Sequence, residues 1–245
     1  SEGCYEDNDN PQYQTLEDCN SICEEQIPGG CGSPVLHQDY LYSTVQIGEQ
    51  CWFSENCRYL PEVSPSSEGN GTDPYYYVYD YEGTDVGAAV STSNYDTYGV
   101  LYNWPAVMTE GLCPSGWHIP TEAEWQTMEI SLGMSWSEAA QTGWRGTDEG
   151  YQMKSSSGWM ISPSDNGSNS SGFTGLPGGY CAPFNSTGYN EKWASATWWS
   201  SSEKPSSVSD TFPQSWVRAL SYDMDDVGRS GGVRYAGFSA RCVRD

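Results

Sequence analysis

The chain has 245 residues, of which 33 are Asp or Glu and 10 are Lys or Arg, so its formal net charge is −23 at pH 7. So acidic a surface repels phosphate backbones and anionic lipids, which argues against nucleic acid as a partner. The chain contains no run of 18 apolar residues, so we expect no membrane insertion. Its 11 Trp and 18 Tyr are too many for a disordered acidic chain, and we expect a folded protein.

Residues 1–33 are predicted to form a small, Cys-rich, acidic N-terminal arm. The stretch holds eight acidic residues and no Lys or Arg, and its Pro28-Gly29-Gly30 sequence is typical of a domain boundary. Residues 34–245 are predicted to form one domain. We expect the arm cysteines to pair among themselves; they are Cys4, Cys19, Cys23 and Cys31.

Nine cysteines in a Lys-poor chain are typical of an oxidising compartment, so we expect a secreted or cell-surface protein. The first residues carry neither a start Met nor a basic segment, which predicts a processed chain. Because nine is odd, one thiol stays free or pairs outside this chain. Asn-x-Ser/Thr sequons predict glycosylation at Asn70, Asn166, Asn169 and Asn185.

Short alternating segments open the domain. Residues 42–47 and 50–53, joined by a Gly-Glu turn, predict a β-hairpin. Cys51 and Cys57 stand six residues apart and are expected to pair locally. The Tyr-rich stretch 75–81 predicts a further strand. Two later segments, 215–220 and 238–243, are also predicted to be strands.

Two capping boxes mark helix starts. Thr121 and Glu124 form the first, and Ser135 and Glu138 repeat the spacing, which predicts a second short helix near 136–142. The buried side of the first helix is predicted to hold Ala123, Trp125 and Met128. Two short helices with many short strands and long loops indicate an α+β fold.

Six motifs, in a fixed order over residues 35–245, resemble one family. They are Val45-Gln-Ile-Gly-Glu-Gln-Cys-Trp-Phe-Ser-Glu-Asn56, Tyr98-Gly-Val-Leu-Tyr-Asn-Trp104, Cys113-Pro-Ser-Gly-Trp-His-Ile-Pro-Thr-Glu-Ala-Glu-Trp125, Gly172-Phe-Thr-Gly-Leu-Pro-Gly-Gly179, Trp198-Trp-Ser-Ser-Ser-Glu203 and Gly237-Phe-Ser-Ala-Arg-Cys-Val-Arg-Asp245. Together they resemble the Fibrobacter succinogenes major paralogous domain, a relative of C-type-lectin-like and formylglycine-generating-enzyme folds.

This resemblance implies a C-type-lectin-like domain in which two short helices flank a twisted antiparallel sheet with long ordered loops. It also implies secretion or surface display. Lectin-like folds bring the segment before the first helix close to the terminal strand, so the resemblance further implies a disulfide between Cys113 and Cys242.

Catalytic groups are sparse, and we expect no enzymatic activity. A Ser/His/Asp site needs a His that is free to move a proton. His37 lies in the segment that enters the domain, and the resemblance suggests a structural hydrogen bond for His118. Formylglycine-generating enzymes bind copper through two neighbouring Cys, but here the C-terminal region offers only Cys242, with Cys181 far upstream. No catalytic residue is singled out.

Two ligand sites are nevertheless predicted. Carboxylates in a loop favour a structural Ca²⁺, with a plain acidic loop as the alternative; they belong to Asp223, Asp225 and Asp226. Exposed rings in the Gly/Ser-rich stretch favour ligand binding, because aromatic rings stack on sugars. These rings are Trp136, Trp144 and Trp159, whereas the Trp residues of the family motifs are expected in the core.

The sequence therefore predicts a non-enzymatic, secreted structural or adhesive module that self-assembles in an extracellular surface fibre. A carbohydrate-binding lectin-like module is the alternative, so the expected partner is a second copy or an extracellular glycan. The acidic arm is expected to contact an Arg-bearing region of its own or a neighbouring subunit, giving a head-to-tail filament. That region comprises Arg218, Arg229, Arg234, Arg241 and Arg244.

Overall fold

The structure is a computed structural model that describes residues 30–160, 166–183, 188–208 and 210–245. Its helices are α2 (Val86–Val90), α3 (Ser93–Tyr98), α4 (Trp104–Val107), α5 (Glu122–Leu132), α6 (Trp136–Ala139) and α7 (Glu149–Met153). Its strands are β1 (Val35–His37), β2 (Tyr40–Tyr42), β3 (Thr44–Ile47), β4 (Gln50–Phe53), β5 (Tyr76–Tyr77), β6 (Leu101–Tyr102), β7 (Trp117–His118), β8 (Gly143–Arg145), β9 (Tyr180–Cys181), β10 (Tyr189–Asn190), β11 (Ser195–Glu203), β12 (Gln214–Ser221), β13 (Val227–Val233) and β14 (Val243–Arg244).

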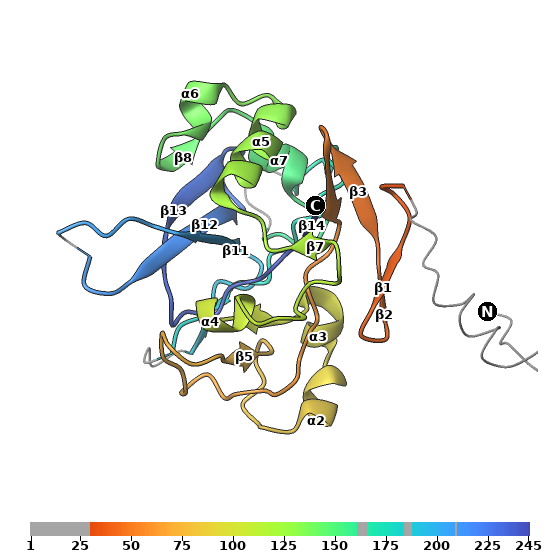
Figure 1. Cartoon of the computed structure of the whole chain (residues 1–245), viewed down its shortest axis with the longest axis vertical. Coiled ribbons are helices and arrows are strands. Elements are labelled where there is room, and N and C mark those ends of the chain that lie inside the picture. The colour runs from red at the N-terminus through yellow and green to blue at the C-terminus, as the bar shows by residue number, and fades with distance from the viewer. Residues whose placement is uncertain (1–29, 161–165, 184–187, 209) are drawn as a thin grey trace, which may run out of the picture.

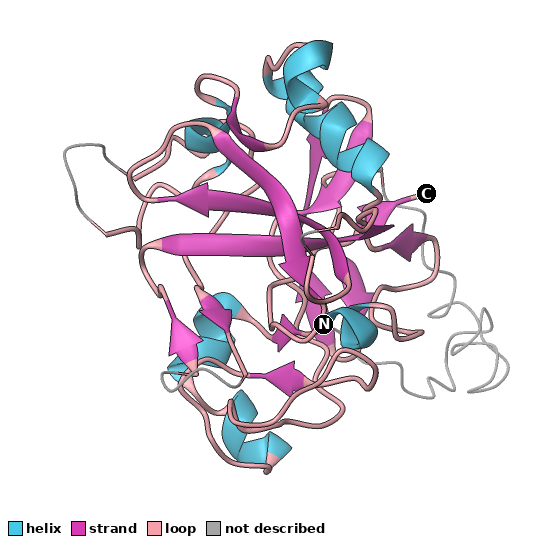
Figure 2. Cartoon of the chain, turned by 90° about the vertical axis from the view of Figure 1, so that its left-hand side faces the viewer, coloured by secondary structure: helices cyan, strands magenta, loops and turns pink. Residues whose placement is uncertain are grey.

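Two four-stranded antiparallel sheets organise the fold. One has the order β11-β12-β13-β8, and the other has the order β3-β4-β14-β7. Smaller two-stranded sheets pair β1 with β2, β5 with β6, and β9 with β10. Long strands cross the middle of the molecule, and short helices and loops surround them (Figures 1 and 2). The chain thus has a mixed α and β fold with several antiparallel sheets.

The core has two main clusters because side chains of consecutive strand residues point to opposite faces. On β4, Trp52 packs in the cluster beneath α5, whereas Phe53 packs in the other. On β11, Trp198 and Trp199 divide in the same way. Each strand therefore supplies large rings to both clusters.

Helix α5 begins at the predicted capping box, in which the Thr121 hydroxyl accepts from the Glu124 N–H and the Glu124 carboxylate accepts from Thr121. Trp125 and Met128 are buried as expected, but the prediction for Ala123 is wrong, because this residue is exposed. Positions two apart on a helix lie about 200° apart, so Ala123 and Trp125 face opposite sides. Glu129, four residues after Trp125, is buried instead.

The second predicted helix is confirmed, although α6 ends at Ala139 rather than near residue 142. The predicted number of helices, two, is too low. Four further short helices are present: α2, α3, α4 and α7. Among the predicted strands, 215–220 matches β12. In the stretch 75–81 only β5 is a strand, and the stretch 238–243 reaches a strand only at its end, where β14 begins. Among the described residues, each helix is too short or too polar to cross a membrane.

Most of the predicted arm, including Cys4, Cys19 and Cys23, lies outside the described residues. Its last residues, 30–33, are attached to the domain. The Gly32 N–H donates to the Thr44 hydroxyl at 2.9 Å, and that hydroxyl donates to the Ser33 carbonyl at 2.9 Å. These contacts fix the chain against β3 before it enters β1.

Candidate functional site

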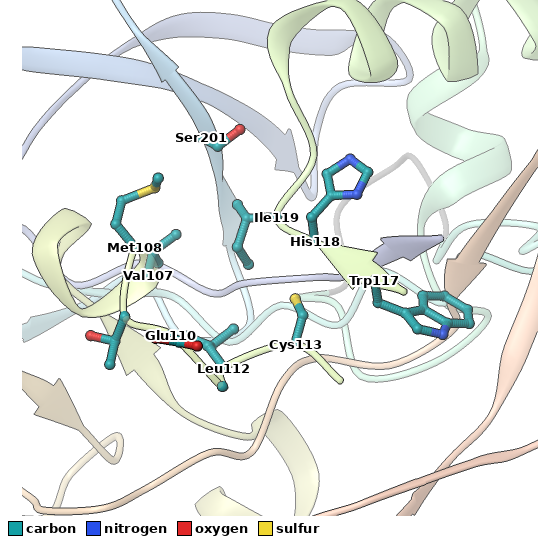
Figure 3. A pocket seen from close by; sticks show the side chains of 11 residues that line it. Val107, Met108, Glu110, Leu112, Cys113, Trp117, His118, Ile119 and Ser201 are labelled. Carbon is teal, nitrogen blue, oxygen red and sulfur yellow. The ribbon is translucent and has the colours of Figure 1, made fainter. Parts of the chain in front are cut away.

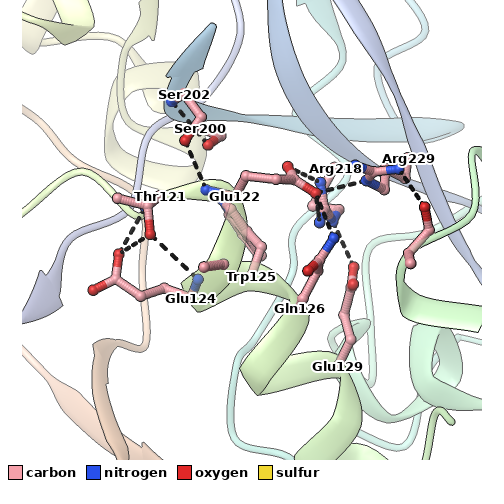
Figure 4. Close-up of polar contacts among 12 residues, drawn as sticks. Thr121, Glu122, Glu124, Trp125, Gln126, Glu129, Ser200, Ser202, Arg218 and Arg229 are labelled. Carbon is pink, nitrogen blue, oxygen red and sulfur yellow. Dashed lines mark hydrogen bonds and ion pairs between the residues drawn. The ribbon is translucent and has the colours of Figure 1, made fainter. Parts of the chain in front are cut away.

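Buried charges meet between α5 and the β11-β12-β13-β8 sheet (Figure 4). The carboxylate of Glu129 accepts from Arg218 Nε at 2.6 Å and from Arg145 Nη2 at 2.6 Å. The carboxylate of Glu122 accepts from Arg218 Nη2 at 2.8 Å and from Arg229 Nε at 2.6 Å. Neither Arg218 nor Glu129 exposes its side chain. Because each carboxylate binds two arginines, this network joins the helix to the sheet.

The C-terminal arginines therefore form no joint basic surface, and the prediction that the acidic arm contacts them loses its basis. Arg218 and Arg229 belong to the network above. Arg241 is fully buried and donates to backbone carbonyls, while the half-buried Arg234 pairs with a glutamate of β11. Of the five, only Arg244 is exposed. The sequence places these five Arg in its last 28 residues, but the fold uses most of their charge internally.

His118 lines a cavity of about 360 Å³, and Cys113 and Trp117 line it too (Figure 3). Its Nδ1 lies 2.5 Å from Asp245 Oδ1, and its Nε2 lies 2.8 Å from Glu124 Oε1. Partial burial lowers the pKa of His118, but the hydrogen bonds to these carboxylates outweigh burial and raise it. Both ring nitrogens are thus engaged, which suits a structural role, and neither is free to take a proton from a substrate.

The predicted calcium ligands do not converge. The Asp223 carboxylate accepts from the Ser221 hydroxyl at 2.5 Å, and the exposed Asp225 lies 3.7 Å from Lys154 Nζ. Asp226 is half-buried, and burial raises its pKa. Within the described ranges, no three His, Cys, Asp or Glu side chains are grouped so that they could hold a metal ion.

A buried lysine explains how this acidic loop is held. The Lys154 side chain is fully buried, and its ammonium donates to the carbonyls of Ser221 and Met224 at 3.2 and 2.7 Å. Burial lowers the pKa of Lys154, while Asp225 opposes that shift. The ammonium therefore holds the loop mainly through its backbone carbonyls, and of the predicted calcium ligands it pairs with Asp225.

The predicted ligand-binding rings separate into two groups. Trp159 was expected on the surface, but it is buried, and its indole N–H donates to the Ser155 hydroxyl and the Gly175 carbonyl, both at 3.1 Å. Trp136, at the start of α6, is 74% exposed, and Trp144 on β8 is also exposed. Ligand binding by these two rings stays a prediction.

One exposed ring escaped the sequence analysis. Trp193 is 53% exposed and has a φ of 70°, a backbone conformation that is unusual for a bulky residue. The Lys192 ammonium lies 4.8 Å from the centre of this ring and 4.9 Å from that of Tyr79. It also pairs with Asp80 at 3.0 Å. The cluster combines an exposed apolar ring with the mostly buried Lys192 ammonium and the exposed Asp80 carboxylate. Its members come from segments about 110 residues apart.

Exposed apolar side chains lie at two places on opposite sides of the domain. Leu36 on β1 and Leu41 on β2 are directly opposite each other in the hairpin and are 59% and 57% exposed. In the loop between β11 and β12, Phe212 is half exposed and packs against Tyr235. Figure 1 shows the hairpin at the right edge of the molecule and this loop at the left edge.

The cysteine pattern differs in part from the prediction. Cys113 and Cys242 form the disulfide that the family resemblance implied. The expected Cys51–Cys57 pair is wrong, because Cys51 bonds to Cys31. The prediction that the arm cysteines pair only among themselves is therefore also wrong for Cys31.

The backbone gives the reason. The Phe53 N–H donates to the Cys242 carbonyl and the Cys57 N–H to the Ala240 carbonyl, so residues 53–57 run antiparallel beside 240–242. This pairing carries Cys57 away from Cys51 and towards Cys242. Cys57 and Cys181 are free, buried thiols.

Glycosylation of the sequons stays a prediction. Asn185 lies outside the described residues. The side-chain amide of Asn70 donates to Asp73 at 2.9 Å, that of Asn169 donates to Thr174 at 3.0 Å, and the Asn166 side chain accepts from the Trp159 N–H. A glycan on Asn70 or Asn169 would replace one of the two amide hydrogens and leave one N–H for these local hydrogen bonds.

Comparison with known families matches residues 45–244 to the Fibrobacter succinogenes major domain. The chain belongs to this family. The match spans β3 to β14, so it includes both four-stranded sheets and α5 with its charge network. Neither the curated proteins nor the solved structures yielded a match. The family assignment confirms the resemblance seen in the motifs and supplies no reaction.

Proposed function

We propose that this Fibrobacter succinogenes major domain protein is a non-enzymatic, extracellular structural or adhesive module that associates with further copies of itself. The single observation that carries the proposal is that apolar side chains are exposed on opposite sides of the domain, Leu36 and Leu41 on one side and Phe212 on the other. The leucine pair, Leu36 and Leu41, of one copy would contact the loop that carries Phe212 in the next copy. Such a contact is heterologous, because it joins two different surfaces. Repetition of such a contact gives an open chain rather than a closed dimer.

The role of the ionisable groups supports a non-enzymatic function. Glu122, Glu129 and three arginines bind one another, His118 is held at both nitrogens, and Lys154 binds backbone carbonyls. A catalytic acid or base must instead face a substrate. An extracellular location is supported by the Cys31–Cys51 and Cys113–Cys242 disulfides, which persist in oxidising compartments.

Electrostatics sets the conditions for association. Copies with a net charge of −23 repel one another, whereas contact between apolar surfaces is favourable and short-ranged. Salt shortens the Debye length from about 30 Å at 0.01 M to about 8 Å at 0.15 M. Salt should therefore promote association. An interface between the acidic arm and basic residues would weaken with salt instead.

Light scattering on the full chain tests the proposal. The weight-average mass should rise with protein concentration, and at a fixed concentration it should be larger at 0.15 M than at 0.01 M salt. A mass that stays at the monomer value of 27.0 kDa under all conditions would refute self-association. Turnover of any substrate abolished by one point substitution would refute the non-enzymatic part.

Carbohydrate binding is the second candidate function, and the Trp193 cluster favours it. The apolar face of a pyranose stacks on an exposed indole, while its hydroxyls need donors and acceptors such as Lys192 and Asp80 beside the ring. A glycan array probed with the full chain tests this candidate. Retention that is lost in Trp193→Ala and kept in Trp136→Ala would support it, whereas equal retention of all three proteins would exclude the Trp193 cluster.

A further inference from the structure

Three sulfur atoms meet in the core where the segment after β4 runs beside the C-terminal strand. The Cys57 Sγ lies 3.5 Å from the Cys242 Sγ, and Cys242 is already bonded to Cys113. Cys57 and Cys242 are both buried, with 1% and 0% of their surface exposed. A free thiol is thus in contact with one sulfur of a disulfide.

The two possible leaving sulfurs have different surroundings. Cys113 is half-buried and lines the 360 Å³ cavity, together with the exposed residues Met108 and Glu110 (Figure 3). Its sulfur points towards the side of the cavity where His118 and Ile119 lie. If the disulfide were to move from Cys113 to Cys57, the free thiol would move from the closed core to a cavity with a solvent-exposed rim.

We propose that Cys57 exchanges with the Cys113–Cys242 disulfide, and that Cys113 is thereby a site of covalent modification by external disulfides. The Cys57 thiol loses its proton, and its sulfur attacks the Cys242 Sγ. The Cys57–Cys242 bond forms as the Cys113–Cys242 bond breaks, and Cys113 leaves as a thiolate that takes up one proton. The step needs no oxidant, because the number of disulfides is unchanged.

The second step uses a disulfide from outside the chain, such as one of low molecular mass or one in another subunit. The Cys113 thiolate attacks one sulfur of that disulfide. A mixed disulfide on Cys113 forms, and the other half of the reagent leaves as a thiolate. This route attaches a partner to the cavity while Cys242 remains bonded to Cys57.

The surroundings of Cys57 control the rate. Burial raises the pKa of the Cys57 thiol to about 12, although the nearby Arg241 guanidinium favours the thiolate in part. Only a small fraction is therefore ionised near neutral pH, and exchange should be slow. The thiolate fraction, and with it the exchange rate, should increase about tenfold for each pH unit between 7 and 9. Contact between the reacting sulfurs partly offsets the low thiolate fraction.

Cys181 provides a matched control. It is also a free and fully buried thiol, and burial raises its pKa as well. It packs on β9 among residues such as Tyr77 and Leu101, and no disulfide in the described part of the chain contacts its sulfur. Substitution of Cys181 should therefore leave the exchange unchanged.

The test incubates the native full chain with iodoacetamide at pH 7 and pH 9, quenches with acid and maps peptides without reduction. We expect alkylated Cys113 together with a Cys57–Cys242 peptide pair, both accumulating faster at pH 9. A parallel sample with oxidised glutathione should carry glutathione on Cys113. Both products should be absent in Cys57→Ala and in the larger Cys57→Val, and present at the wild-type level in Cys181→Ala.

Two results would overturn the proposal. One is an intact Cys113–Cys242 disulfide, with no modified Cys113, after prolonged incubation at pH 9. The other is equal modification of Cys113 in the wild type and in both Cys57 variants. Thermal unfolding of each variant identifies any that is unfolded, and the wild-type peptide map decides the question even if both Cys57 variants fail to fold.

Discussion

The interior beneath α5 and the surface of the β1–β2 hairpin are opposites in chemistry. In the interior, Glu129 and Arg218 are completely buried, and each has a partner of opposite charge. On the hairpin, Leu36 and Leu41 are apolar and mostly exposed. Charge is normally kept at the surface and large apolar groups inside. The two regions reverse this rule. The buried charges beneath α5 therefore stabilise the fold, whereas the surface of the β1–β2 hairpin is suited to apolar contact.

Glu129→Gln should give the largest loss of stability, because it leaves Arg145 and Arg218 buried without their shared carboxylate. Breaking a buried ion pair by removing one partner costs about 3–5 kcal/mol. Chemical denaturation should reveal this loss in the free energy of unfolding. The matched control Glu49→Gln removes an exposed carboxylate and should change stability by less than about 0.5 kcal/mol. Equal effects of the two substitutions would contradict the structural role of the network.

Trp125→Ala should cost about 3–5 kcal/mol, since the ring is fully buried and its removal leaves a cavity. The ring centre lies 4.9 Å from that of Trp52 and 5.9 Å from that of Phe173, so both rings lose a contact. Trp136→Ala is the surface control and should leave the melting temperature nearly unchanged. If Trp125→Ala melts at the wild-type temperature, the core assignment of α5 is wrong.

Lys154→Met tests a buried charge outside the α5 network, with an expected loss of about 1–3 kcal/mol. The substitution keeps the apolar stem but leaves the Ser221 and Met224 carbonyls without their donor. Asp225→Asn should change stability by less than about 0.5 kcal/mol, because Asp225 is exposed and contributes only a long ion pair. A larger effect for Asp225→Asn than for Lys154→Met would show that the carboxylate, rather than the ammonium, holds the loop.

The starts of α5 and α6 were predictable from the sequence. The capping boxes at Thr121 and Ser135 involve residues three apart, and both form as expected. Trp125 was correctly placed in the core from its position on the capped helix, whereas Ala123 was not. The resemblance of the ordered motifs gave the family and the Cys113–Cys242 disulfide.

Apart from the Cys113–Cys242 disulfide, features that depend on distant residues were not predictable. Trp159 is buried through a hydrogen bond to a carbonyl 16 residues away, and the acidic loop is held by a lysine about 70 residues earlier. The contact between Cys57 and Cys242 joins residues 185 apart. The exposure of Leu36 and Leu41 depends on how the hairpin stands against the domain, and alternation alone does not reveal which face is covered.

A smaller effect concerns His118, whose pKa is raised in the folded state by its two carboxylate partners. Below the unfolded-state pKa of about 6.5 the full stabilisation is present, and it is lost as the pH rises through the folded-state pKa. The contribution should be below about 1 kcal/mol, because the ring is about one-third exposed. As the pH is raised from below about 6.5 to above the folded-state pKa, the melting temperature should fall less in His118→Gln than in the wild type. An identical pH dependence in both proteins would remove His118 as its cause.

The double substitution Leu36→Ser/Leu41→Ser should have almost no effect on folding, because both side chains are exposed. Sedimentation velocity of the full-length protein at 0.15 M salt tests the central claim most directly. The wild type should show oligomers that grow with concentration, and the double variant should sediment as a monomer with an unchanged melting temperature. If the double variant forms the same oligomers as the wild type, the leucine pair is not the contact surface and the proposed mode of assembly is wrong.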